Sequence, residues 1–216
     1  MTNTDDATPC FTYEPEVAFR GARTYVHSTT LYRELLAGAE AFGLAVDGAI
    51  TLRVRRLILH QPVLRYFRSS ALVSDQAAAV FSLQAGSASL HGEVTDGDRP
   101  VLKREQYDET LLATLAIQDG QAIEASDIPI MSPFEIITSL NLLLHHRLFT
   151  LPDNRKWYLA TIELDRPLLS ESTRRIRIEL IRTLGTIMTR ATILTNSQRI
   201  GHLEYIKGPV TDGLST

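Results

Sequence analysis

The sequence predicts an α+β fold of two tandem repeats, each a helix followed by an antiparallel sheet. The order of helical and extended patterns in the first half recurs in the second. The second helical pattern is apolar around most of its circumference, which is typical of a buried helix. Offsets of 104, 105 and 99 residues separate three corresponding pairs: Val26 and Ile130, Pro62 and Pro167, Gly86 and Gly185. The alternative is a single α+β domain in which helices and strands merely alternate.

The first repeat begins with a predicted helix over 29–42, with Ser28 as N-cap and Gly43 just beyond its end. Its apolar face consists of Leu31, Leu35, Ala39 and Phe42. A strand over 50–59 and a proline-containing segment follow. The remaining predicted elements are extended runs over 77–84 and 88–95, a turn at 96–98 and a strand over 100–104.

The second repeat has the same order. Its helix is predicted over 133–149, with Ser132 as N-cap, Pro133 in the first helical position and Glu135 in the third, which is the pattern of a capping box. The remaining predicted elements are a strand over 157–164, a proline-containing segment, extended runs over 175–182 and 186–194, a turn at 196–197 and a strand over 199–206.

These patterns divide the chain into two repeats with a linker between them and a loose tail at each end. The expected boundaries are 1–10 (tail), 11–107 (first repeat), 108–126 (linker), 127–208 (second repeat) and 209–216 (tail).

Charge and composition exclude several classes of function. The net charge of −3 disfavours nucleic acid as a partner, because phosphate binding requires a positive excess. Cys10 is the single cysteine, so no internal disulfide can form and a cytoplasmic location is expected. No apolar run approaches the roughly 18 residues of a membrane span, so no membrane association is expected.

Two short segments carry a resemblance to a known family. Each repeat has a strand leading into a segment with a proline between apolar residues: Leu59-His60-Gln61-Pro62-Val63 and Leu164-Asp165-Arg166-Pro167-Leu168. With the preceding helices and following long strands, the chain over roughly 20–207 resembles the hotdog superfamily. It is similar to tandem double hotdogs, namely polyketide dehydratase domains and the A-factor biosynthesis family, and Tyr25-Val26-His27 is similar to the Val-His segment of the latter.

This resemblance implies an enzyme that processes acyl thioesters, bound to acyl carrier protein or coenzyme A, in fatty-acid-like or polyketide-like metabolism. Two positions depart from the dehydratase pattern. Leu31 stands where that pattern has a glycine, and Ile137 stands where it has the aspartate of the catalytic pair. Only His27 therefore has a counterpart, and Met131 occupies its place in the second repeat.

We expect His27 to act as general acid or base beside a helix start, with a carboxylate from Glu34 or Glu135 assisting. Structural alternatives exist for each, because His27 can hold a turn, Glu34 can be a solvated helix residue and Glu135 can simply cap its helix.

Three further residues are candidates for substrate binding. Tyr32 can place a phenol beside a thioester, although a core tyrosine satisfies the same pattern. Arg53 and Arg55 can meet the phosphates of coenzyme A or phosphopantetheine, or they can keep an exposed strand soluble. No metal-ligand spacing and no phosphate-binding loop occurs, so we expect neither metal nor cofactor.

Three functional hypotheses follow. The first is a 3-hydroxyacyl-thioester dehydratase or isomerase, that is, a lyase-like enzyme. The second is an acyltransferase or thioesterase that uses the same groups. The third is a non-catalytic double hotdog that binds an acyl group or a partner protein. A monomer and a homodimer are both compatible with a tandem fold.

Overall fold

The computed structural model describes residues 9–107, 110–126, 131–168 and 175–210. Most of the two expected tails, 1–8 and 211–216, lies outside these residues, as does Ile130. The chain forms two compact units that divide between Gln106 and Tyr107. Each unit combines one long helix with an antiparallel sheet.

The first unit has a five-stranded antiparallel sheet in the order β1-β4-β6-β5-β3. A separate parallel pair, β2 with β7, lies outside it. A short 3-10 helix, η2, covers Ser70–Leu72. The bounds are β1 Phe11–Tyr13, β2 Ala18–Arg20, α1 Ser28–Ala41, β3 Ile50–Val54, β4 His60–Phe67, β5 Ala79–Ala85, β6 Ala88–Pro100 and β7 Lys103–Glu105.

Helix α1 begins one residue earlier than predicted, with His27 as its N-cap and Ser28 as its first residue. Its end follows the prediction. Gly43 has a φ of 73° and its N–H donates to the Glu40 carbonyl, while the next N–H, from Leu44, donates to the Ala39 carbonyl. This pair of bonds is a Schellman motif, which satisfies the last carbonyls of the helix.

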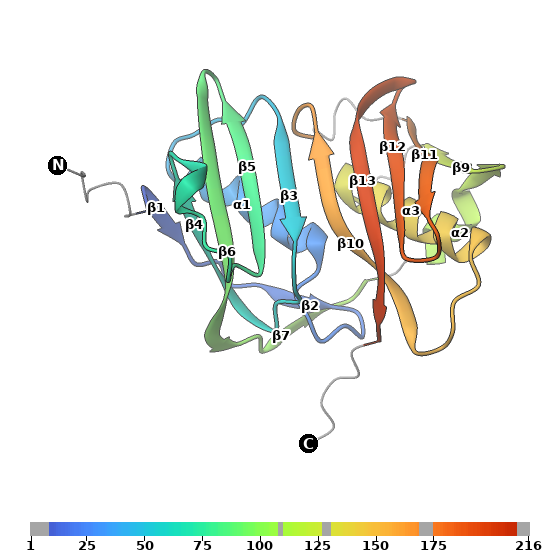
Figure 1. The fold of residues 1–216 in the computed structure, drawn as a ribbon, viewed down its shortest axis with the longest axis horizontal. Coiled ribbons are helices and arrows are strands. Elements are labelled where there is room, and N and C mark those ends of the chain that lie inside the picture. The colour runs from blue at the N-terminus through green and yellow to red at the C-terminus, as the bar shows by residue number, and fades with distance from the viewer. Residues whose placement is uncertain (1–8, 108–109, 127–130, 169–174, 211–216) are drawn as a thin grey trace. The chain divides into compact units, whose positions relative to one another are not determined.

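Helix α1 lies against one face of its sheet (Figure 1). Leu31, Leu35 and Ala39 are buried, as their spacing predicts. The phenol of Tyr66 on β4 donates to the Leu35 carbonyl at 2.9 Å. Phe42, which was expected on the same face, is instead exposed and stacks on another aromatic ring at the sheet edge.

The region around Pro62 differs from the prediction. The expected strand over 50–59 ends at Val54, and Pro62 lies inside the next strand, β4, next to a register shift that accommodates it. The expected turn at 96–98 was wrong, because β6 continues through it. The Asp96 carboxylate accepts the backbone N–H groups of Leu59 and His60, at 3.0 and 2.7 Å, and so joins the two strands there.

The second unit has a six-stranded antiparallel sheet in the order β10-β13-β12-β11-β9-β8. The segment expected to be a linker, 108–126, instead contributes α2, β8 and β9, and β9 pairs with β11. The bounds are α2 Thr110–Leu115, β8 Ile117–Asp119, β9 Ala122–Ser126, α3 Pro133–Leu148, β10 Arg155–Leu164, β11 Arg175–Leu184, β12 Met188–Thr195 and β13 Gln198–Pro209.

Helix α3 has the predicted capping box. The Ser132 hydroxyl accepts from the Glu135 N–H, and the Glu135 carboxylate accepts from the Ser132 N–H at 2.8 Å. The helix contacts β9, β10 and β11 (Figure 1). Most of its residues are buried. The predicted turn between β12 and β13 is also present, with Asn196 and Ser197 both at positive φ, as a tight hairpin requires.

Among the described residues, no helix combines the length and apolar character needed to cross a lipid bilayer.

Candidate functional site

The candidate site of the first unit is the start of α1. His27 caps the helix without donating or accepting a side-chain cap bond, and its Nδ1 lies 2.7 Å from the Thr29 hydroxyl oxygen. The preceding residue, Val26, is buried, and its N–H donates to the Ile58 carbonyl at 2.8 Å. The backbone hydrogen bond of Val26 and the Thr29 hydroxyl therefore hold the His27 imidazole in place.

Burial lowers the pKa of His27 well below its usual value, and the positive charges of Arg23 and Arg20 lower it further. The imidazole is consequently neutral at physiological pH. A neutral imidazole can accept a proton, which is the state that a general base requires.

The two arginines are positioned by the parallel pair of β2 and β7. Arg104 on β7 donates to the Gly21 carbonyl and, at 2.8 Å, to the Arg23 carbonyl. Gly21 has a φ of 57°, a conformation that glycine adopts readily. Arg20 is buried, with its Nε 3.8 Å from a Glu105 carboxylate oxygen. The start of α1 therefore combines helix N–H groups with two guanidinium groups.

Glu34 is buried on α1, seven residues after His27, which places it roughly 10 Å farther along the helix axis. Its carboxylate accepts from Arg33 Nε at 2.9 Å and from the Tyr13 phenol at 3.3 Å. Burial raises the pKa of Tyr13, and the neighbouring Glu34 charge raises it further, so this phenol stays protonated and donates. Glu34 is therefore held on the same helix as His27 but in a separate network.

Glu135 lies in the second unit. Its carboxylate accepts from both the backbone N–H and the hydroxyl of Ser132, at 2.8 and 2.7 Å. Met131, the residue that corresponds to His27, is partly buried. At the start of α3, the side chains of Ser132 and Glu135 therefore occupy the first backbone N–H groups. The start of α1 has no side-chain cap bond and no acidic residue in its first turn.

The three predicted substrate-binding residues have different surroundings. Tyr32 is buried in the core, and Arg53 is exposed on β3. Arg55 is exposed and its guanidinium donates to the carbonyls of Ser74 and Asp75, both at 3.3 Å. The Arg55 guanidinium therefore holds the loop at Ser74 and Asp75, a role that the sequence did not predict.

Sequence reasoning missed the two arginines beside His27. They precede it by four and seven residues, so a local cluster of basic residues was visible in the sequence. The proximity of these arginines to the His27 imidazole was not visible, because it depends on Arg104, which holds the loop and is 81 residues from Arg23.

The second unit contains a buried histidine of a different kind. His145 on α3 donates from Nδ1 to the Asn141 carbonyl at 2.6 Å, and its Nε2 therefore accepts from the Thr189 hydroxyl on β12, at 2.5 Å. Its ring stacks on Tyr205 and packs beside Trp157. Burial lowers the pKa of His145 to about 4, so it is neutral and joins the helix to the sheet.

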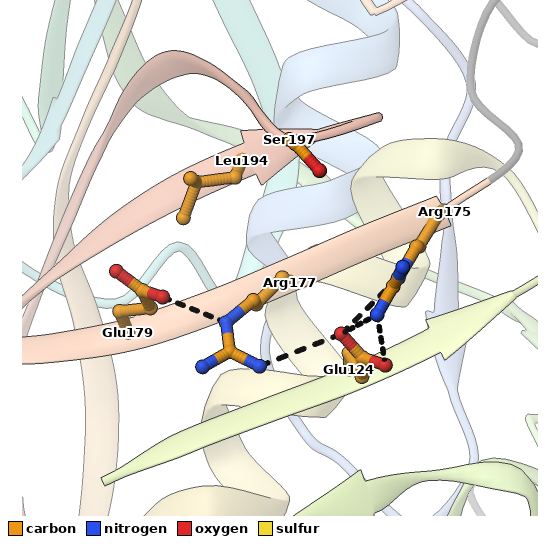
Figure 2. Close-up of a pocket in the computed structure, with 6 residues that line it drawn as sticks. All are labelled: Glu124, Arg175, Arg177, Glu179, Leu194 and Ser197. Atoms are coloured by element: carbon orange, nitrogen blue, oxygen red, sulfur yellow. Dashed lines mark hydrogen bonds and ion pairs between the residues drawn. The ribbon is translucent and has the colours of Figure 1, made fainter. Parts of the chain in front are cut away.

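A hollow of about 340 Å³ lies on the second unit's sheet. Figure 2 shows Arg175 and Arg177 on either side of Glu124, with Glu179 beyond. Arg175 Nη2 contacts both Glu124 carboxylate oxygens, at 2.6 and 2.8 Å, and Arg177 Nε donates to Glu179 at 2.7 Å. The Arg175 hydrogen bonds hold the pKa of Glu124 below its usual value. Because the four charges neutralise one another, this hollow has no charge preference.

Within the described part of the chain, no three His, Cys, Asp or Glu side chains form a group that could hold a metal ion.

Comparisons with known proteins find structural similarity. No protein-family model matches the sequence, and no curated protein matches it. The chain is similar in structure to a pyran synthase domain from module nine of the sorangicin pathway, with 9% identity, a TM-score of 0.48 and coverage of 91% of this chain and 92% of that one.

Two further solved structures are dehydratase domains. One is the dehydratase domain of RzxB from Pseudomonas fluorescens, with 9% identity, a TM-score of 0.46 and coverage of 95% of this chain and 90% of that one. The other is a fusion DH domain, with 11% identity, a TM-score of 0.45 and coverage of 87% and 80%.

Proposed function

We propose that the chain is a tandem double hotdog that processes acyl thioesters, carried by acyl carrier protein or coenzyme A, by dehydratase or isomerase chemistry. One arrangement supports the proposal: His27 is the N-cap of α1, its Nδ1 lies 2.7 Å from the Thr29 hydroxyl oxygen, and the charges of Arg23 and Arg20 act on its ring. Removal of a proton next to a thioester requires a neutral base and a positive environment for the developing oxyanion.

In this reaction His27 takes a proton from the carbon next to the thioester carbonyl. Negative charge develops on the carbonyl oxygen, and the N–H groups of α1 with Arg20 and Arg23 stabilise it. The 3-hydroxyl then leaves as water after receiving a proton, and an enoyl thioester remains. Glu34 or Glu135 would assist this proton transfer, or the His27 imidazolium would return the proton it took.

The experiment uses the full chain with a panel of 3-hydroxyacyl pantetheine thioesters of increasing acyl length. Mass spectrometry detects dehydration as the loss of one water from the acyl group, whereas hydrolysis or transfer releases the pantetheine thiol. His27→Asn should abolish the loss of water. His91→Asn, on the first unit's sheet, is the matched control and should retain it.

Full activity of His27→Asn on every thioester that the wild type processes would overturn the proposed role. Glu34→Gln and Glu135→Gln identify the assisting carboxylate, because only its replacement should slow turnover without a change in fold.

One observation favours a second candidate, an acyl-binding or partner-binding double hotdog without catalysis. Both candidate carboxylates already have structural partners, Glu34 with Tyr13 and Arg33, and Glu135 with Ser132. A thioester that raises the thermal stability of the wild type, through binding to the folded state, but remains chemically unchanged would establish this alternative.

A further inference from the structure

The proposed reaction needs a donor for one further proton, because the 3-hydroxyl must be protonated before it leaves as water. Glu34 is buried about 10 Å along α1 from His27 and is bound by Tyr13 and Arg33. Glu135 lies in the second unit and caps α3. A donor that works together with His27 should lie near the start of α1 and should be open to a substrate.

A second histidine of the first unit, His60, is paired with a carboxylate. Its Nδ1 lies 3.3 Å from one oxygen of Asp96, and the other oxygen of Asp96 accepts the backbone N–H groups of Leu59 and His60. These two N–H groups hold the carboxylate, and the carboxylate in turn orients the imidazole. When the ring is protonated, it forms an ion pair with Asp96, and Nε2 carries the second ring proton.

The pair of His60 and Asp96 lies on the face of the sheet that α1 covers. The Tyr66 side chain on β4 points to α1, since its phenol donates to the Leu35 carbonyl. Because alternate side chains of a strand share a face, Pro62 lies on the same face as Tyr66. Asp96 on β6 is directly opposite Pro62, so its carboxylate is also on this face, with the His60 ring beside it.

The pair also lies at the end of the sheet where α1 begins. The Val26 N–H donates to the Ile58 carbonyl at 2.8 Å, so the residue before His27 contacts the segment that leads into β4. Strand β4 begins two residues later, at His60. The starts of α1 and β4 are therefore neighbours, with one imidazole at each. The His60 side chain is 45% exposed and the Asp96 side chain is 26% exposed, so both are open to a substrate.

We propose that His60, held by Asp96, is a second catalytic residue of the His27 site and donates the proton with which the 3-hydroxyl leaves. This inference rests on the proposed function, in which His27 removes the proton from the carbon next to the carbonyl. The Nε2 proton of His60 passes to the oxygen of the 3-hydroxyl. As the bond between that oxygen and carbon breaks, the electrons of the enolate form the carbon–carbon double bond, and water leaves. His27 then releases its proton to solvent and His60 takes one up, which restores the starting state.

Three thioesters separate the two proton transfers on the full chain. A 3-hydroxyacyl pantetheine thioester requires both transfers. An acyl thioester without the hydroxyl reports the first transfer alone, through deuterium uptake in D₂O. A 3-chloroacyl thioester eliminates chloride, which leaves without a proton.

His60→Asn should lose water from the hydroxyacyl thioester at least about 100-fold more slowly than the wild type, because general acid catalysis contributes that much or more. It should keep the wild-type rates of deuterium uptake and of chloride elimination, after subtraction of the rates without protein. Retained deuterium uptake also shows that the variant is folded.

Asp96→Asn provides a second variant, because asparagine keeps an oxygen for the N–H groups of Leu59 and His60 but removes the charge. It should slow the loss of water and leave deuterium uptake unchanged. His91→Asn, on the same sheet, is the matched control and should keep all three reactions at the wild-type rate.

Loss of water at the wild-type rate in His60→Asn, or the loss of all three reactions together, would overturn the role of His60 without affecting that of His27. A wild type that takes up no deuterium and loses no water would instead overturn the proposed function on which the inference rests.

Discussion

Acid should weaken the second unit through His145. The side chain is 1% exposed and its pKa is lowered from 6.5 to about 4 by burial. Between these two pH values the unfolded chain binds a proton at His145 that the folded chain does not. The free energy of unfolding therefore falls as the pH decreases through this window and changes no further, through this group, below about pH 4. From pH 7 to about pH 4.5 the loss amounts to roughly 2 to 3 kcal/mol.

Urea unfolding at a series of pH values measures this loss, with fluorescence of Trp157 as the probe because its ring packs beside His145. His145→Gln cannot titrate, so its free energy of unfolding should fall by roughly 2 to 3 kcal/mol less than that of the wild type over the same pH range. Thr189→Val is a second variant, which keeps the titrating ring but removes its hydroxyl partner. Parallel pH profiles for the wild type and His145→Gln would refute the reasoning.

Three further outcomes are expected. Gly38→Ala should destabilise the first unit by about 2 kcal/mol in urea unfolding, because the added Cβ would lie 2.2 Å from the Tyr66 phenol oxygen. Tyr66→Phe in the same chain should relieve part of this cost, and an undiminished cost would contradict the clash. Ser132→Ala should cost about 1 kcal/mol through loss of the capping box, and an unchanged melting temperature would contradict that role. Arg23→Gln should raise the pKa of His27 in an NMR titration, since it removes a positive charge beside the ring, and a constant or lower pKa would show that the guanidinium does not act on it.

Elements with strong local signals were predictable from the sequence. The capping box of α3 and the glycine that ends α1 satisfy backbone groups with residues nearby in the chain, so their residue types reveal them. The elements predicted incorrectly depend on distant partners. The expected turn at 96–98 is instead part of a continuous strand, in which the Asp96 carboxylate accepts from backbone N–H groups 36 and 37 residues away.

In the proposed site, too, only local features are visible in the sequence. His27 was identified from its place before a helix, a local feature. Its charged surroundings depend on the long-range contacts of Arg104, and no local pattern signals these. Glu34 shows the same limit. Its helical position was predicted, but the phenol that donates to its carboxylate comes from Tyr13 on β1, 21 residues earlier.

Deuterium exchange tests the central claim most directly. The full chain is incubated in D₂O with an acyl thioester that carries no 3-hydroxyl, so that the proton next to the carbonyl can be removed and returned but no water can be lost. The account predicts that deuterium enters that carbon in the presence of the wild type and of His91→Asn, and not in the presence of His27→Asn. Equal deuterium incorporation with wild type and His27→Asn would contradict it, as would the absence of incorporation with a wild-type chain that binds the thioester.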